Sequence, residues 1–102
     1  MRTAIVQMWK TKGDWPATRA DFDHALTLNP KQPETWNNRA NLRVLQSDWT
    51  GALADYSQSL TLKPTVAAYH NRSLVWQQLG KRTEAEQDMV ESQKLNARER
   101  GF

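Results

Sequence analysis

The sequence predicts an all-α fold, a stack of three antiparallel helix hairpins. Two observations carry this prediction. No segment of the chain shows the strict apolar–polar alternation of a half-buried strand. The chain also repeats itself, since Trp15 and Phe22 recur one period later as Trp49 and Tyr56. Further pairs in the same phase are Trp36 with Tyr69, Asn38 with Asn71, Arg39 with Arg72, and Ala52 with Ala85. Self-similarity at a period of roughly 34 residues is typical of helical repeat arrays.

The central hairpin defines the repeat unit. Its first helix is predicted over about 36–45, followed by a turn at 46–48 and a second helix that ends near residue 62. Gly51 lies inside this second helix, where glycine costs about 1 kcal/mol relative to alanine. Pro64 begins the link to the next hairpin because a proline disfavours the helical conformation in the residue before it.

The first hairpin is predicted from a helical face and two breaks. Ala4, Ile5, Met8 and Trp9 share one face of a helix over residues 1–12. Residues 13–14, Gly-Asp, end that helix, and Pro16 suits the first turn of the next one. This second helix is expected to stop near Asn29 and Pro30.

The third hairpin carries its own end signals. Gly80 can adopt the left-handed conformation that closes a helix. Thr83 and Glu86 match a capping box, in which each side chain bonds a backbone N–H of the first turn. Residues 96–102 are polar and are expected to fray. The prediction is therefore about six helices in a single domain, with repeats at about 1–32, 33–65 and 66–97 and a frayed tail at 98–102.

The composition is that of an ordinary globular chain, with 38% hydrophobic and 25% charged residues. The absence of cysteine excludes disulfides and thiolate metal sites. A net charge of +3 without a basic block gives no indication of nucleic-acid binding. No segment approaches the roughly 18 apolar residues of a membrane span, and the N-terminus lacks a signal-peptide pattern. We therefore expect no membrane insertion and a cytoplasmic location.

The recurring residues resemble the tetratricopeptide repeat (TPR) family, over nearly the whole chain from residue 1 to about 96. The matching positions are Ile5, Val6, Trp9, Phe22, Ala25 and Pro30 in the first repeat, Trp36, Arg39, Ala40, Ala52, Tyr56 and Pro64 in the second, and Tyr69, Arg72, Ser73, Trp76, Ala85 and Met89 in the third. The resemblance implies an α-solenoid, the TPR superhelix. It also implies that small residues, Ala40 and Ser73 within hairpins and Ala25, Ser59 and Ser92 on second helices, lie where helices cross closely.

The chain departs from the TPR pattern at several positions. Thr18 stands where the other repeats have alanine, and Ala97 stands where the closing proline is expected. Arg39 and Arg72 replace a leucine of the family pattern. TPR arrays commonly carry a polar capping helix after the last hairpin, and none follows here. We therefore expect an open outward face that includes Val90, and an uncovered face of this kind favours a partner chain or self-association.

In TPR proteins the first helices line a concave groove that commonly holds a peptide. The resemblance places these residues in the groove: Gln7, Lys10, Asn37, Asn38, Asn41, His70, Asn71 and Leu74. An asparagine carboxamide offers both a donor and an acceptor to a peptide backbone. The alternative interpretation is that the asparagines bond to neighbouring helices and bind nothing.

Arg39 and Arg72 also allow two interpretations. They could await an acidic ligand, or their heads could pair with acids such as Asp55 or Asp88 on adjoining helices. The second is favoured. A chaperone-type carboxylate clamp is not predicted, because its cationic groups are missing. His24 and His70 share no metal-ligand spacing with other residues.

The resulting hypothesis is a protein–protein interaction module or scaffold that binds a peptide or partner protein in the groove. No enzymatic activity, cofactor, metal or nucleic-acid partner is expected. The alternative is a structural role, in which uncapped end faces drive homo-oligomerisation or extend a longer array.

Overall fold

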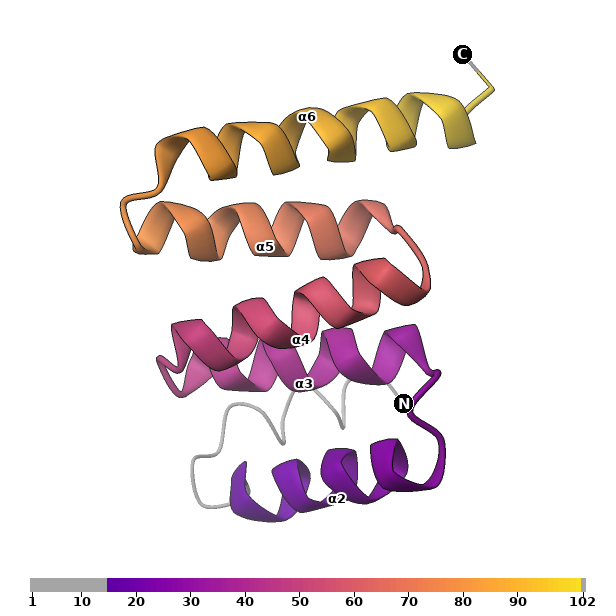
Figure 1. Cartoon of the computed structure of the whole chain (residues 1–102), viewed down its shortest axis with the longest axis vertical. Helices are drawn as coiled ribbons and strands as arrows, with labels where there is room; N and C mark the ends of the chain where they lie inside the picture. Colours follow the sequence, from indigo (N-terminus) through magenta and orange to yellow (C-terminus); the bar gives the residue numbers. More distant parts are fainter. Residues whose placement is uncertain (1–14, 102) are drawn as a thin grey trace.

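The computed structural model describes residues 15–101, which form five α-helices (Figure 1). These are α2 (Trp15–Leu28), α3 (Pro33–Leu45), α4 (Trp49–Leu62), α5 (Val66–Gln78) and α6 (Arg82–Glu99). No strand occurs in the described residues, so the all-α prediction is confirmed for them. The helix expected over residues 1–12 lies outside this part of the chain.

Successive helices run in opposite directions along the stack, and α3 lies partly behind α4 in the view of Figure 1. The most extensive contacts are within the hairpins α3–α4 and α5–α6, and α4 packs on α5 to join the two. Helix α2 packs on α3. A narrow seam between α3 and α5 brings the first helices of these two hairpins together. Each helix is therefore held mainly by its neighbours in sequence.

The core is built at the junction of α3, α4 and α5. Ala40, Ala52, Tyr56 and Val75 form one buried cluster. Ala40 and Ser73 have no exposed surface, and Ser59 is buried as well. Of the small residues predicted at close helix crossings, Ala40, Ser59, Ser73 and Ser92 are buried, and Ala25 is only partly buried. Because Val75 belongs to α5, the same cluster that closes one hairpin also anchors the next.

The turn between α3 and α4 explains the glycine inside α4. Asp48 caps α4, and its Oδ1 accepts a hydrogen bond of 3.0 Å from the Gly51 N–H. A Cβ at position 51 would lie 2.3 Å from Asp48 Oδ2 and 3.0 Å from Arg43 Cδ. A larger residue would therefore displace the Asp48 carboxylate from its position at the cap and press against the Arg43 side chain. Glycine at position 51 therefore leaves room for the Asp48 cap and for the Arg43 side chain. The interactions of these two residues offset the low helix propensity of glycine.

Two helix starts differ from the sequence prediction. Helix α3 begins at Pro33, earlier than expected, because proline fits the first helical turn. The capping box predicted at 83–86 is wrong, since α6 already begins at Arg82 and Lys81 holds the cap position without a side-chain hydrogen bond. The left-handed Gly80 ends α5 as predicted and leaves only one residue before α6. Helix α6 continues to Glu99, so residues 96–99 are helical.

Ser47 and Gly80 occupy the same place in the two hairpin turns, one period apart. Both have positive φ, 59° for Ser47 and 74° for Gly80. A non-glycine residue in this conformation is strained by roughly 1–2 kcal/mol. Ser47 offers no compensating side-chain hydrogen bond within the described residues.

We expect Ser47→Gly to raise the free energy of unfolding by about 0.5–1 kcal/mol. Glycine removes the backbone strain, and its larger loss of backbone entropy on folding offsets part of this gain. Gly80→Ser is the matched control and should lower it by a similar amount. Urea denaturation followed by circular dichroism measures both. A stabilising Gly80→Ser would contradict the account of these turns.

Candidate functional site

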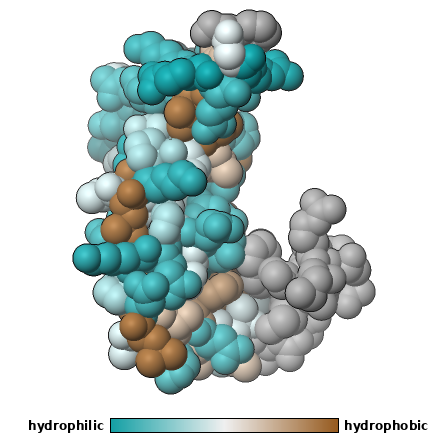
Figure 2. All heavy atoms as spheres, turned by 90° about the vertical axis from the view of Figure 1, so that its right-hand side faces the viewer, coloured by the Kyte–Doolittle hydropathy of each residue, from teal (hydrophilic) through white to brown (hydrophobic). Residues whose placement is uncertain are grey.

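Two hollows lie along the seam between α3 and α5. The first, about 410 Å³, is called here the uncharged hollow and is lined by Asn41, Val44, Leu45, Trp49, Tyr56, Asn71, Leu74, Val75, Gln77 and Gln78. The second, about 340 Å³, is called the charged hollow and is lined by Pro33, Glu34, Asn37, Asn38, Ser59, Lys63, Thr65 and Ala67. The charged hollow lies at the end where α3 and α5 begin. Figure 2 views the molecule from that end, where the surface is mainly hydrophilic with small separate apolar patches.

The structure divides the predicted groove residues between these hollows. Asn41, Asn71 and Leu74 line the uncharged hollow. Asn37 and Asn38 line the charged hollow. The in-phase pair Asn38 and Asn71 therefore lies in two different hollows. His70 is exposed and lines neither, and Gln7 and Lys10 lie outside the described residues.

A buried tyrosine holds the amides of the uncharged hollow. The Tyr56 hydroxyl donates a hydrogen bond to Oδ1 of Asn41. The same oxygen accepts a second hydrogen bond, of 3.4 Å, from Nδ2 of Asn71. Tyr56 is 1% exposed. Its burial, and then the charge of Asp55, raise the pKa of Tyr56 well above its ordinary range, so the hydroxyl remains a neutral donor.

Sequence reasoning did not find this tyrosine–asparagine bond. Asn41 and Tyr56 lie on opposite sides of the hairpin turn, in α3 and α4. One period after Asn41 the chain has Leu74, so no repetition marks the position. The signal that existed was chemical: Tyr56 is expected in the core, and a buried phenol needs a hydrogen-bond partner.

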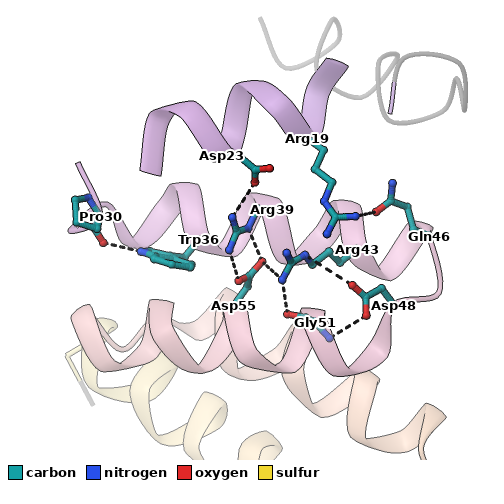
Figure 3. Close-up of polar contacts among 10 residues, drawn as sticks. All are labelled: Arg19, Asp23, Pro30, Trp36, Arg39, Arg43, Gln46, Asp48, Gly51 and Asp55. Atoms are coloured by element: carbon teal, nitrogen blue, oxygen red, sulfur yellow. Dashed lines mark hydrogen bonds and ion pairs between the residues drawn. The ribbon is translucent and has the colours of Figure 1, made fainter. Parts of the chain in front are cut away.

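The arginines predicted to be either ligand-binding or paired are paired. Arg39 forms a two-bond ion pair with Asp55, at 2.9 Å from Nε to Oδ2 and 2.9 Å from Nη2 to Oδ1 (Figure 3). Its Nη1 donates to Oδ1 of Asp23 on α2 at 2.8 Å. Asp55 is 2% exposed. Hydrogen bonding to Asp55 raises the pKa of Arg39, although burial opposes the shift.

The same arrangement recurs one period later. Arg72 pairs with Asp88 at 2.7 Å through Nε and 2.7 Å through Nη2. Its Nη1 donates to Oγ of Ser57 on α4 at 3.0 Å. Each guanidinium also lies over an aromatic ring of the preceding helical turn, Arg39 at 5.0 Å from Trp36 and Arg72 at 6.0 Å from Tyr69. Neither head group is free to meet an acidic ligand.

Arg43 completes the charged cluster beside Arg39 (Figure 3). Its Nη1 lies 3.3 Å from Asp55 Oδ2 and donates to the Gly51 carbonyl at 3.3 Å. Its Nε lies 3.8 Å from Asp48 Oδ2, which is an ionic contact but too long for a hydrogen bond. The buried Asp55 is thus shared by two arginines.

No family model matches the sequence, and no curated protein matches it either. Solved structures do match. One is the type III secretion translocator chaperone SycD of Yersinia enterocolitica, in an alternative dimer form. Its TM-score is 0.80 at 15% identity, and the match covers 93% of this chain and 77% of the other. The chain has the fold of this chaperone. At this identity, the likeness shows the fold alone.

Two further properties of residues 15–101 bear on the site. No helix among them is both long and apolar enough to cross a membrane. Within the same residues, no three His, Cys, Asp or Glu side chains gather closely enough to hold a metal ion.

We expect Asp55→Asn to lower the free energy of unfolding by about 3–5 kcal/mol, because it leaves Arg39 without its buried counter-charge. Asp23→Asn is the matched control, since the Asp23 side chain is 52% exposed and binds the same arginine. Loss of the Asp23 charge should lower the free energy of unfolding by about 0–1 kcal/mol. Urea denaturation of both variants provides the comparison, and equal losses would show that burial does not set the strength of this network.

Proposed function

We propose that this chain is a protein-interaction module that binds a peptide or a segment of a partner protein between α3 and α5. We further propose that its hairpins form a TPR-type α-solenoid, in which the first helix of each hairpin lines the binding face. The observation that carries the proposal is the uncharged hollow, where three helices meet around apolar side chains and oriented amides. Its volume of about 410 Å³ lies within the range of roughly 300–1,000 Å³ common for ligand sites.

The exposed leucines of this hollow support binding. Leu45 on α3 and Leu74 on α5 are each 45% exposed. Fully burying one leucine side chain contributes roughly 1.5–3 kcal/mol of free energy. A ligand that covers the exposed part of both leucines should therefore gain a fraction of this free energy from each. The asparagine and glutamine side chains around them supply directional hydrogen bonds. A similar fold in a chaperone agrees with a role in holding other proteins.

The proposed mechanism is presentation by a preformed surface. The arginine–aspartate pairs fix how α3 and α5 sit on their partner helices. The hollow therefore exists before the ligand arrives, and little conformational entropy is lost from the protein side on binding.

The test is a charge placed in the hollow. We expect Leu74→Glu to weaken binding of a hollow-directed peptide at least about tenfold, because the new carboxylate has no partner there. Val90→Glu is the matched control, since Val90 is 46% exposed and lines no part of the seam. Fluorescence anisotropy with a labelled peptide selected from a synthetic array measures both. Equal affinity of Leu74→Glu and the unmodified chain would reject the proposed function.

Self-association through the end of the stack is the second candidate. A hollow of about 550 Å³ at α5 and α6 is lined by Gln77, Gly80, Arg82, Ala85, Glu86 and Met89. These residues lie one period after Val44, Ser47, Trp49, Ala52, Leu53 and Tyr56. In the central hairpin, most of that set forms the cluster that receives Val75 of α5. The hollow at the end of the stack is thus the equivalent seat for a further helix.

Sedimentation velocity over a concentration series tests this second candidate. Val90 lies one period after Ser57, the residue that contacts Arg72 of the following hairpin. Val90→Glu should therefore dissociate an assembly that uses this face and leave peptide affinity unchanged. A mass that stays monomeric at all concentrations would reject self-association.

A further inference from the structure

We infer that the uncharged hollow recognises an extended, uncharged segment of a partner protein, through one main-chain amide and one apolar side chain. In this arrangement, Asn41 and Asn71 hold the main-chain amide, and the apolar side chain lies between Leu45 and Leu74. The inference rests on the proposed function and specifies the chemistry of its ligand.

The charge distribution selects against charged segments. None of the described residues lining this hollow is charged. The two basic residues of α3 are engaged elsewhere, because Arg39 and Arg43 both contact the buried Asp55. A charged side chain entering the hollow would lose its hydration and gain no counter-ion. A neutral apolar side chain loses nothing of this kind.

The hydrogen bonds already made by Asn41 and Asn71 determine which ligand group the hollow can bind. Oδ1 of Asn41 has two lone pairs, and Tyr56 and Asn71 already donate to it. The Nδ2 of Asn41 therefore remains as a donor, and the Oδ1 of Asn71 remains as an acceptor. Within residues 15–101, no hydrogen bond engages either atom. One donor beside one acceptor is the complement of a peptide C=O and N–H.

Tyr56 is the positioning residue of this pair. Its hydroxyl is buried, neutral and fixed to Asn41, so the Asn41 carboxamide cannot rotate without losing a buried hydrogen bond. The orientation that satisfies the tyrosine is the one that leaves Nδ2 unpaired. A phenylalanine at position 56 would keep the packing and release the carboxamide.

The apolar component comes from the repeat itself. Leu74 lies one period after Asn41, and both line the same hollow. The same position of the repeat is therefore polar on α3, as Asn41, and apolar on α5, as Leu74. The uncharged hollow consequently presents an amide and a leucine from equivalent positions of two helices, which suits a segment that offers a main-chain amide together with an apolar side chain.

The first arm of the test is a peptide array. Short peptides capped at both ends are compared with Leu, Met, Phe, Asp or Lys at one central position. We expect apolar residues to bind at least about tenfold more tightly than Asp or Lys, with affinity nearly independent of salt. Tighter binding of Asp or Lys peptides would overturn the inference and leave a groove of another specificity.

The second arm changes one side chain of the protein. Asn41→Asp keeps the acceptor for Tyr56 and Asn71 but replaces the Nδ2 donor with a charged oxygen. The lost donor and the new charge should together weaken binding of the best peptide at least about tenfold, and the third arm isolates the hydrogen bond. Asn29→Asp makes the same change in the exposed link between α2 and α3, outside both hollows, and should leave this peptide unaffected. Unchanged affinity in Asn41→Asp would overturn the inference while a peptide-binding groove remained.

The third arm changes one atom of the peptide. An ester in place of the central amide removes the N–H and should weaken binding to the unmodified chain about tenfold. The ester penalty should shrink when Asn71 is replaced by Ala, because the acceptor is then absent. This arm needs no folded Asn41→Asp variant. An ester that binds as well as the amide overturns the inference, and absence of any bound peptide overturns the proposed function itself.

Discussion

The buried aspartates Asp55 and Asp88 set the constraint on which the rest of the structure depends. Removing a carboxylate from water costs several kcal/mol, so each can be buried only where a cation meets it in good geometry. Arg39 and Arg72 supply that cation from the preceding helix, with two bonds each. The remaining nitrogen of each guanidinium, Nη1, donates to a residue one helix further back, Asp23 for Arg39 and Ser57 for Arg72. One side chain thus fixes three successive helices. We infer that these pairs specify how the hairpins align more than they add to stability, since the desolvation cost offsets most of the gain.

The same pairs determine which chemical groups the proposed binding face presents. Arg39 and Arg72 stand at positions where the TPR pattern has leucine, and a free guanidinium there would suit an acidic ligand. Because both guanidinium groups are paired inside the hairpins, the uncharged hollow between α3 and α5 is lined by amides and apolar side chains only, apart from the Tyr56 hydroxyl. Because two arginines are needed to neutralise the two buried aspartates, neither arginine is available to a ligand at the candidate site. The proposed preference for an uncharged segment therefore depends on these ion pairs as well as on the residues that line the hollow.

Sequence reasoning reached the features that repeat and missed the ones that do not. Arg39 and Arg72, with Asp55 and Asp88, recur in the same phase of successive repeats, and their pairing was predictable from that phase. Gly80 was predictable because its conformation excludes most other residues. The Asn41–Tyr56 bond has no counterpart one period later. The assignment of Asn38 and Asn71 to different hollows depends on how α3 and α5 approach each other, which no local pattern encodes. The start of α6 is the exception, because Arg82 lies one period after Trp49, where α4 starts, whereas the local capping-box pattern indicated a later start.

The comparison of in-phase positions also distinguishes the seam from the end of the stack. Val44, Trp49 and Leu53 pack partly buried against the core where α5 sits on the central hairpin. One period later the same places hold the exposed residues Gln77, Arg82 and Glu86. Each apolar side chain so replaced removes up to about 1.5–3 kcal/mol from the docking of a further helix. The end face keeps the shape of a helix seat and has lost most of the apolar surface that would hold one. The seam between α3 and α5 retains both exposed leucines and oriented amides, and this contrast is why we propose the seam, and not the end face, as the site of specific binding.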